Sequence, residues 1–205
     1  AQIRKAKETA ETIWGKEIKG IWPSEGSVSS EAVKCFAKNG FSWTATDEEV
    51  LFRTLGIPIK RDQNGLLNQG EKLYQIWFFS DDNNKIAIFF RDRYLSDLIG
   101  FVYQHLTSNE AIEDMISHLE KIMDNLPNDN NPVVSVILDG ENAWEYYDNN
   151  GFDFLSGLFK AVSQHTRIIS ITPSKYLNLP GSKSILHSLV PGSWIYGSLN
   201  TWIGN

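Results

Sequence analysis

The sequence predicts an α/β fold, and the expected architecture is a partial (β/α) barrel with parallel strands. Three observations lead to this prediction. A strand–loop–helix pattern occurs twice in the first quarter of the chain, and the uninterrupted β-branched run from Val133 to Leu138 is typical of a central strand covered on both faces. Polar residues also cluster where several predicted strands end, which is where such barrels carry their sites.

The first part of the chain has clear start and stop signals for helices. Ser29-Ser30-Glu31 offers a cap for one helix and Asp47 is placed to cap the next, because such side-chain oxygens can accept hydrogen bonds from the free N–H groups of a first turn. Gly15 and Asn39-Gly40 are placed to end them. The expected elements are a helix over residues 2–14, a strand at about 20–22, a helix from 29–31 to 38, a strand over 41–45 and a helix over 48–55.

The rest of the chain continues the alternation after a polar excursion at residues 57–72. A turn at 80–84 joins two apolar runs into a predicted strand pair, and a polar linker at 127–131 precedes the β-branched run. The expected elements are strands over 74–79 and 85–90, helices over 95–105 and 109–126, a strand over 133–138, a helix over 152–164, a strand over 167–171, and from 181 a long loop with a short helix.

Length, composition and charge narrow the class of protein. With 205 residues, 41% hydrophobic and 21% charged, the chain is expected to be one globular domain. A net charge of -6 argues against a nucleic-acid partner. No run reaches the roughly 18 to 20 apolar residues of a membrane span, so no membrane partner is expected. The chain starts without Met inside a helical pattern, which indicates part of a longer protein; its location stays open, with the cytoplasm favoured.

The cysteine and histidine content predicts neither a disulfide framework nor a metal site. Cys35 is the single cysteine, and the four histidines are scattered without the spacing of metal ligands. No Gly-x-Ser-x-Gly element supports a serine nucleophile. The residues themselves therefore give no spacing for a metal site.

Two acidic residues follow predicted strands and could face each other across a barrel mouth. They are Glu25, in Trp22-Pro23-Ser24-Glu25-Gly26, and Asp139, in Asp139-Gly140-Glu141-Asn142-Ala143-Trp144. Glycoside cleavage needs such a pair, one to attack or stabilise the sugar cation and one to protonate the leaving oxygen. Spacing alone leaves the alternative that both are turn or helix-cap acids.

Two longer strings resemble conserved regions of glycoside hydrolase family 57, in its amylopullulanase-like branch. Gly20-Ile21-Trp22-Pro23-Ser24-Glu25-Gly26-Ser27-Val28-Ser29 is similar to the third region, and Leu138-Asp139-Gly140-Glu141-Asn142-Ala143-Trp144-Glu145-Tyr146 is similar to the fourth. Shorter matches extend the resemblance over nearly the whole chain: Ala45-Thr46-Asp47-Glu48, Phe90-Arg91-Asp92, 95–101, Gly192-Ser193-Trp194 and Trp202-Ile203-Gly204.

The resemblance implies a fold and a mechanism. The complete family domain is a seven-stranded (β/α) barrel, and its first two regions, including a His-Gln-Pro element, are absent here, so residues 1–205 would be a single domain that lacks the first strands. The remainder of the parent chain would complete it. The resemblance also implies Glu25 as nucleophile and Asp139 as general acid/base in a retaining double displacement, which needs their carboxyl groups about 5 to 5.5 Å apart. The implied substrates are α-glucans: starch, glycogen, maltooligosaccharides or pullulan. The resemblance also implies that the chemistry needs no metal or organic cofactor.

Further residues are candidates for holding the glucan. Trp22, Trp144 and Trp194 could stack on glucose rings or pack the barrel wall. Glu141 could be a supporting partner. Four further polar residues could form hydrogen bonds with sugar hydroxyls, orient the catalytic pair or form structural ion pairs: Asp47, Arg91, Asp92 and Asp97.

Other functions stay open at this stage. A 4-α-glucanotransferase of the same family would use the same pair of acids, and a non-catalytic α-glucan-binding relative would keep only the fold. Retention of both Glu25 and Asp139 favours an enzyme. A polysaccharide deacetylase would need an Asp and His metal cluster, which the sequence lacks.

Overall fold

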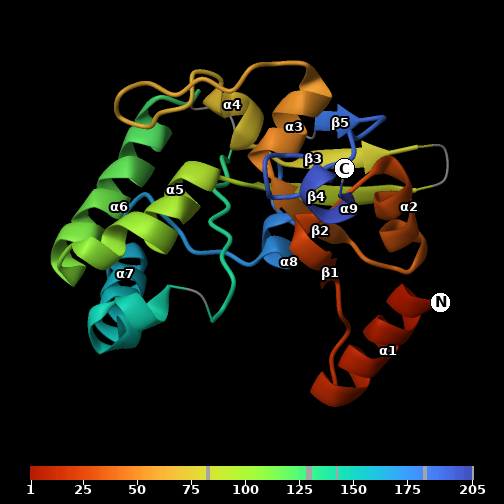
Figure 1. Cartoon of the computed structure of the whole chain (residues 1–205), viewed down its shortest axis with the longest axis horizontal. Helices are drawn as coiled ribbons and strands as arrows, with labels where there is room; N and C mark the ends of the chain where they lie inside the picture. Colours follow the sequence, from red (N-terminus) through yellow and green to blue (C-terminus); the bar gives the residue numbers. More distant parts are fainter. Residues whose placement is uncertain (82–83, 128–130, 142, 182–183, 205) are drawn as a thin grey trace. The chain divides into compact units, whose positions relative to one another are not determined.

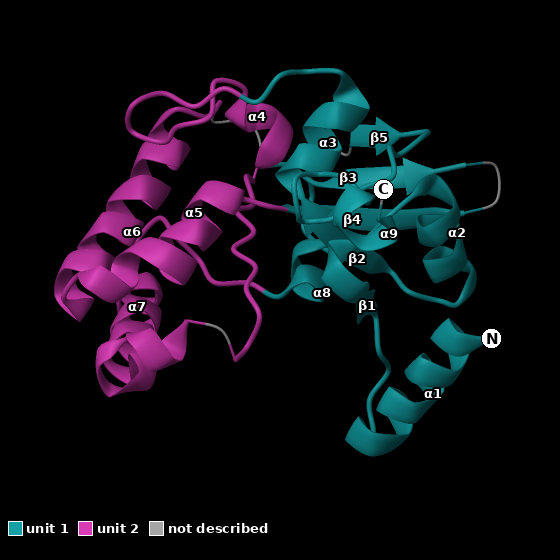
Figure 2. Cartoon of the chain, in the orientation of Figure 1, with its two compact units in different colours: residues 1–59, 75–90, 172–205 teal, residues 60–74, 91–171 magenta. Residues whose placement is uncertain are grey.

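The computed structural model describes residues 1–81, 84–127, 131–141, 143–181 and 184–204. They form two compact units, shown in Figure 2. Unit 1 consists of Ala1–Ile59, Gln75–Phe90 and Thr172–Asn205, and unit 2 consists of Lys60–Tyr74 and Arg91–Ile171. The predicted turn at 80–84 and the predicted linker at 127–131 lie partly outside the described residues, as does position 142.

Unit 1 is built around one sheet, which Figure 1 shows with its helices. The described residues contribute five strands in the order β1-β2-β4-β3-β5. β1 is parallel to β2, and β3 is antiparallel to β4 and parallel to β5, so the sheet is mixed. The strands are β1 (Gly20–Ile21), β2 (Trp43–Asp47), β3 (Trp77–Ser80), β4 (Lys85–Arg91) and β5 (Ser184–Leu186).

Two helices of unit 1, α2 and α3, begin where the capping signals predict. The Ser29 side chain accepts a hydrogen bond from the Ala32 amide at 3.1 Å, and the Asp47 side chain accepts one from the Glu49 amide at 3.0 Å. α2 and α3 both contact β2, and their apolar residues are buried there. The elements are α1 (Gln2–Trp14), the 3-10 helix η1 (Ser24–Gly26), α2 (Ser30–Lys38), α3 (Glu48–Leu55), α8 (Pro173–Tyr176) and α9 (Asn200–Ile203).

Unit 2 is mainly helical, and α6 and α7 pack against each other (Figure 1). Tyr103 and Phe154 are almost fully buried, with ring centroids 5.9 Å apart. The predicted helix over 95–105 is divided into an α-helix, a π-helix and a 3-10 turn. The elements are α4 (Gly70–Leu73), α5 (Arg93–Asp97), η2 (Leu98–Val102), η3 (Tyr103–His105), α6 (Ser108–Asp124), η4 (Trp144–Tyr146), η5 (Asp148–Gly151) and α7 (Phe152–Gln164).

The predicted central strand over 133–138 is wrong. Its one backbone bridge is the parallel pair of Arg91 and Ser135, and the Val136 side chain is 39% exposed. β4 ends at Arg91 and the chain turns into α5, so the strand that could continue the pairing stops there. The backbone of Ile137 is held by side chains instead: its carbonyl accepts from Arg91 Nε and its amide donates to Ser96 Oγ.

Other predictions about strands also differ from the structure, and β3 begins at Trp77, three residues after the predicted start at 74. Residues 167–171 form no strand, and Ile169 is 80% exposed, so an apolar run alone did not produce pairing. β2 begins at Trp43, two residues after the predicted start. β5 lies in the segment predicted to be a loop, because its pairing with β3 depends on a partner far away in the sequence.

No helix in the described part of the chain has both the length and the apolar character needed to cross a bilayer.

Candidate active site

Glu25 lies in a strained turn between β1 and α2. Its backbone angles, φ 55° and ψ 26°, are in the left-handed region that residues with a Cβ rarely adopt. The turn is held by hydrogen bonds from the Gly26 amide to the Pro23 carbonyl (3.0 Å) and from Thr46 Oγ1 to the Gly26 carbonyl (2.7 Å). Such strain costs about 1–3 kcal/mol and persists where the surroundings over-determine it, as at functional sites.

Two tryptophans, Trp22 and Trp194, lie beside the turn that contains Glu25. Trp194 Nε1 donates a hydrogen bond to Glu25 Oε2 at 2.8 Å, and the Trp194 amide donates to the Glu25 carbonyl at 3.1 Å. The Trp22 and Trp194 rings meet edge to face with centroids 5.3 Å apart. We call Trp22, Glu25 and Trp194 the Glu25 cluster. Trp22 is 36% exposed, so a ligand can reach the cluster.

Gly26 shows why this turn contains a glycine. A Cβ added there would come within 2.8 Å of the Trp22 ring, and the backbone φ of 59° is also left-handed. The group that lies closest to a Cβ added at Gly26 is therefore the Trp22 ring. Any side chain at position 26 would force the Trp22 ring to shift.

Asp47 is fully buried at the end of β2. Its relative exposure is 0%, and its carboxylate caps α3. Asp47 therefore has no exposed surface in this structure with which to accept a hydrogen bond from a sugar hydroxyl. Its role as a cap accounts for an acidic residue at this position.

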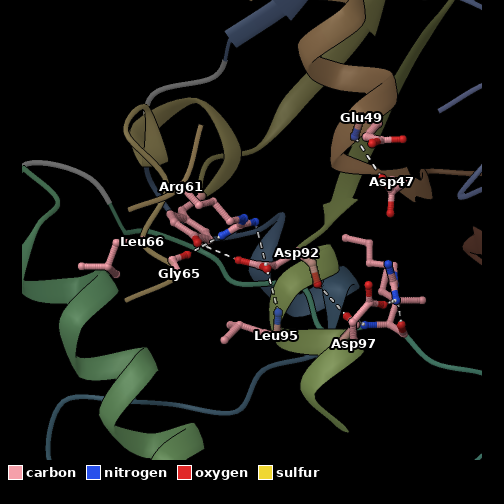
Figure 3. Close-up of polar contacts among 12 residues, drawn as sticks. Asp47, Glu49, Arg61, Gly65, Leu66, Asp92, Leu95 and Asp97 are labelled. Atoms are coloured by element: carbon pink, nitrogen blue, oxygen red, sulfur yellow. Dashed lines mark hydrogen bonds and ion pairs between the residues drawn. The ribbon is translucent and has the colours of Figure 1, made fainter. Parts of the chain in front are cut away.

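Asp92 is also fully buried, and Figure 3 shows it between Arg61 and Leu95. Tyr74 donates its hydroxyl to Asp92 Oδ2 at 2.6 Å, while Oδ1 accepts from the guanidinium of Arg61 at 3.2 Å and from the Leu95 amide at 3.0 Å. Burial, and then the charge of Asp92, raises the pKa of Tyr74 well above its usual range, so its phenol stays protonated and donates.

The partners of Asp92 were not predicted from the sequence. Arg61 lies in the polar excursion at 57–72, where it also donates to the Gly65 carbonyl at 2.9 Å and lies over the Tyr94 ring. Neither Arg61 nor Tyr74 belongs to a recognisable motif. Their contact with Asp92 forms only when the excursion folds back onto the start of α5.

We expect the Asp92→Asn variant to lose about 3 kcal/mol of unfolding free energy, because the amide replaces a buried charged acceptor of hydrogen bonds from Tyr74, Arg61 and the Leu95 amide and turns an NH₂ donor toward these donors. Urea denaturation measures the loss. Asp124→Asn is the matched control: it breaks the exposed pair of Asp124 and Arg167, whose side chains are 59% and 50% exposed, and should cost about 0–1 kcal/mol. Equal losses in the two variants would contradict this interpretation of Asp92.

Arg91 anchors the segment that leads to Asp139. Its guanidinium forms an ion pair with Asp97 at 2.7 Å, and its Nε donates to the Ile137 carbonyl at 2.9 Å. Arg91 is 6% exposed, while the Asp97 side chain is 42% exposed. The structural ion pair, one of the predicted alternatives, is therefore present. The Asp97 side chain remains partly exposed to solvent.

Asp139 and its neighbours follow this anchored segment. Asp139 is half-buried and Glu141 is exposed. Trp144 Nε1 donates to the Gly140 carbonyl at 2.9 Å, which closes the turn that follows Asp139. Because Glu25 belongs to unit 1 and Asp139 to unit 2, their approach to each other stays a prediction.

The described residues contain no group of three or more His, Cys, Asp or Glu placed to hold a metal ion. The candidate site residues supply carboxylates, a guanidinium group and indole N–H donors. These groups can supply a nucleophile, a proton donor and ring faces for an apolar ligand surface.

A mixed sheet with flanking helices, and with acidic residues after its strands, places the chain in the α/β class, and its likeness to solved structures identifies it as part of a (β/α) barrel. The model of glycosyl hydrolase family 57 matches residues 1–188, so the chain belongs to this family. The family predicted from the two sequence strings is thereby confirmed.

Solved structures support the same fold. The 4-α-glucanotransferase of Thermococcus litoralis is 22% identical with a TM-score of 0.69, over 93% of this chain and 27% of that one. The branching enzyme of Thermococcus kodakaraensis (14% identity, TM-score 0.71) and the α-amylase AmyC of Thermotoga maritima (15% identity, TM-score 0.70) each match 99% of this chain and 48% of their own. The chain thus spans less than half the length of these proteins. No curated protein matches it.

Proposed function

We propose that residues 1–205 are a single-domain part of the catalytic barrel of a retaining glycosidase that acts on α-glucans, with an amylase- or amylopullulanase-like activity. Glu25 is the proposed nucleophile and Asp139 the proposed general acid/base. The observation that carries the proposal is the strained Glu25 turn, whose carboxylate accepts a hydrogen bond from Trp194 beside an exposed tryptophan. Membership of family 57 agrees with it.

The proposed mechanism has two displacements. Glu25 forms a bond to the anomeric carbon as the glycosidic C–O bond breaks, and protonated Asp139 gives its proton to the departing oxygen. Asp139, now ionised, then takes a proton from a water molecule or sugar hydroxyl, whose oxygen attacks the same carbon and releases Glu25. Two inversions give net retention of configuration.

The substrate contacts that we propose follow from exposure. Trp22, Trp194 and Trp144 would offer ring faces to glucose, and Asp97 and Glu141 would accept hydrogen bonds from sugar hydroxyls. The nearly buried Arg91 would orient the segment before Asp139. For the fully buried Asp47 and Asp92 we propose structural roles as the caps of α3 and α5, respectively.

A transferase is the second candidate. If a sugar hydroxyl replaces water as acceptor, the same two acids carry out glucan transfer. The likeness to the 4-α-glucanotransferase of Thermococcus litoralis favours this candidate, while the family model matches hydrolases by its description. A non-catalytic α-glucan-binding protein would have no use for a strained glutamate with an oriented carboxylate. We also propose that the remainder of the parent chain completes the barrel.

Product analysis of the full-length protein on amylose and pullulan tests the proposal. Proton NMR during the first turnovers should show α-anomeric reducing ends, because double displacement retains the configuration of the substrate. Initial β-anomers would overturn the mechanism. Chains longer than the substrate would indicate transfer, and cleavage of pullulan at α-1,6 links would indicate an amylopullulanase.

A further inference from the structure

The Glu25 carboxylate is bound on one oxygen only. Oε2 accepts the indole N–H of Trp194 at 2.8 Å, and the described residues provide no hydrogen bond to Oε1. We infer that Trp194 is a positioning residue for Glu25, which holds Oε2 so that Oε1 is the atom that attacks the anomeric carbon. This inference rests on the proposed function and adds to the stacking role predicted for Trp194.

Trp194 can hold Glu25 because its own position is set by contacts on several sides. The backbones of Val28 and Gly192 form an antiparallel bridge, with hydrogen bonds of 2.8 and 3.0 Å, that brings the C-terminal segment beside the Glu25 turn. The neighbouring Ser193 is fully buried and donates to the Ser198 carbonyl at 2.7 Å. The indole therefore reaches the carboxylate from a rigid frame.

An indole is suited to orient a nucleophilic carboxylate. It is a hydrogen-bond donor only, so it neither accepts the proton that Asp139 must deliver nor supplies one of its own. It is also neutral. A lysine would form an ion pair with the carboxylate and weaken its attack on the anomeric carbon, whereas the indole orients the carboxylate without an ion pair. A hydrogen bond to a charged acceptor is about twice as strong as one between neutral groups, which is sufficient to select one side-chain orientation.

The hydrogen bond from Trp194 to Glu25 is compatible with both the free carboxylate and the covalent intermediate of the proposed reaction. When Oε1 forms its bond to the anomeric carbon, the glycosidic oxygen leaves with the proton of Asp139, and Oε2 becomes the carbonyl oxygen of the ester. That oxygen still accepts the Trp194 N–H. The hydrogen bond therefore persists through the intermediate, and its main effect is on geometry before attack, where a displacement of about 1 Å can cost about a factor of 100 in rate.

The experiment replaces Trp194 in the full-length protein. Trp194→Phe keeps an aromatic face and removes the N–H, so kcat should fall about 10- to 100-fold with little change in KM. Trp194→His returns an N–H donor and should recover part of the loss. Trp43→Phe is the matched control, because it removes an indole hydrogen bond to Ser174 of 3.2 Å outside the Glu25 cluster; its kcat should stay that of the wild type.

A trapping measurement separates this inference from the proposed function. A 5-fluoroglycosyl fluoride should label wild-type Glu25 covalently, as read by peptide mass spectrometry, and label Trp194→Phe at least 10-fold more slowly. Absence of label on wild-type Glu25 would overturn the proposed function. Wild-type labelling with an equal rate in Trp194→Phe would overturn the positioning role alone, as would a Trp194→His variant that is folded and no faster than Trp194→Phe.

Discussion

Replacing Glu25 with glutamine is expected to abolish turnover of maltooligosaccharides in the full-length protein while leaving glucan binding intact. The amide has nearly the shape of the carboxylate but lacks the charge and nucleophilicity needed to attack the anomeric carbon. Loss of a catalytic nucleophile typically lowers kcat by a factor on the order of 10⁴ or more. Initial rates and isothermal titration with a maltooligosaccharide measure the two effects.

The Glu25→Gln result needs a control of the same chemistry. Glu31 lies in the first turn of α2 and its side chain is exposed, so Glu31→Gln makes the same substitution outside the Glu25 cluster. This control should keep wild-type rates. A Glu25→Gln protein with unchanged turnover would end the assignment of Glu25 as nucleophile.

Replacing Asp139 with asparagine is expected to reduce activity according to the leaving group. On maltooligosaccharides, whose departing oxygen needs a proton, the rate should fall by about 10² to 10⁴. On an α-glucosyl fluoride, fluoride leaves without protonation and the first displacement should be much less affected. Steady-state rates on the two substrates give the comparison.

The contrast between substrates is what identifies the acid. Asp148 is exposed in the same unit, so Asp148→Asn removes a carboxylate close in the sequence and should leave both rates unchanged. Equal losses of the Asp139→Asn protein on both substrates would argue against the acid role. Two results together would indicate that both residues act on one sugar, although they belong to different units: an inactive Glu25→Gln protein, and an Asp139→Asn protein whose loss of rate depends on the leaving group.

Much of the fold and the principal site motifs were predictable because local chemistry determines them. Ser29 and Asp47 were predicted as helix caps, and both accept the expected amide hydrogen bonds, since a cap depends on residues two or three positions away. The family was likewise predicted from the continuous strings around Glu25 and Asp139, and the match over residues 1–188 confirms it. The pairing of the two acids remains a prediction.

By itself, the sequence determined the capped helices, the strand pair and the family; only the tertiary structure decided the contacts that depend on distant segments. The run at 133–138 has the composition of a strand, but β4 ends at Arg91 and offers it a single bridge. The hydrogen bond from Trp194 to Glu25 and the ion pair of Arg61 with Asp92 join residues that share no local pattern. Such contacts are set by how loops close and which groups must share buried space, and those conditions exist only in the folded chain.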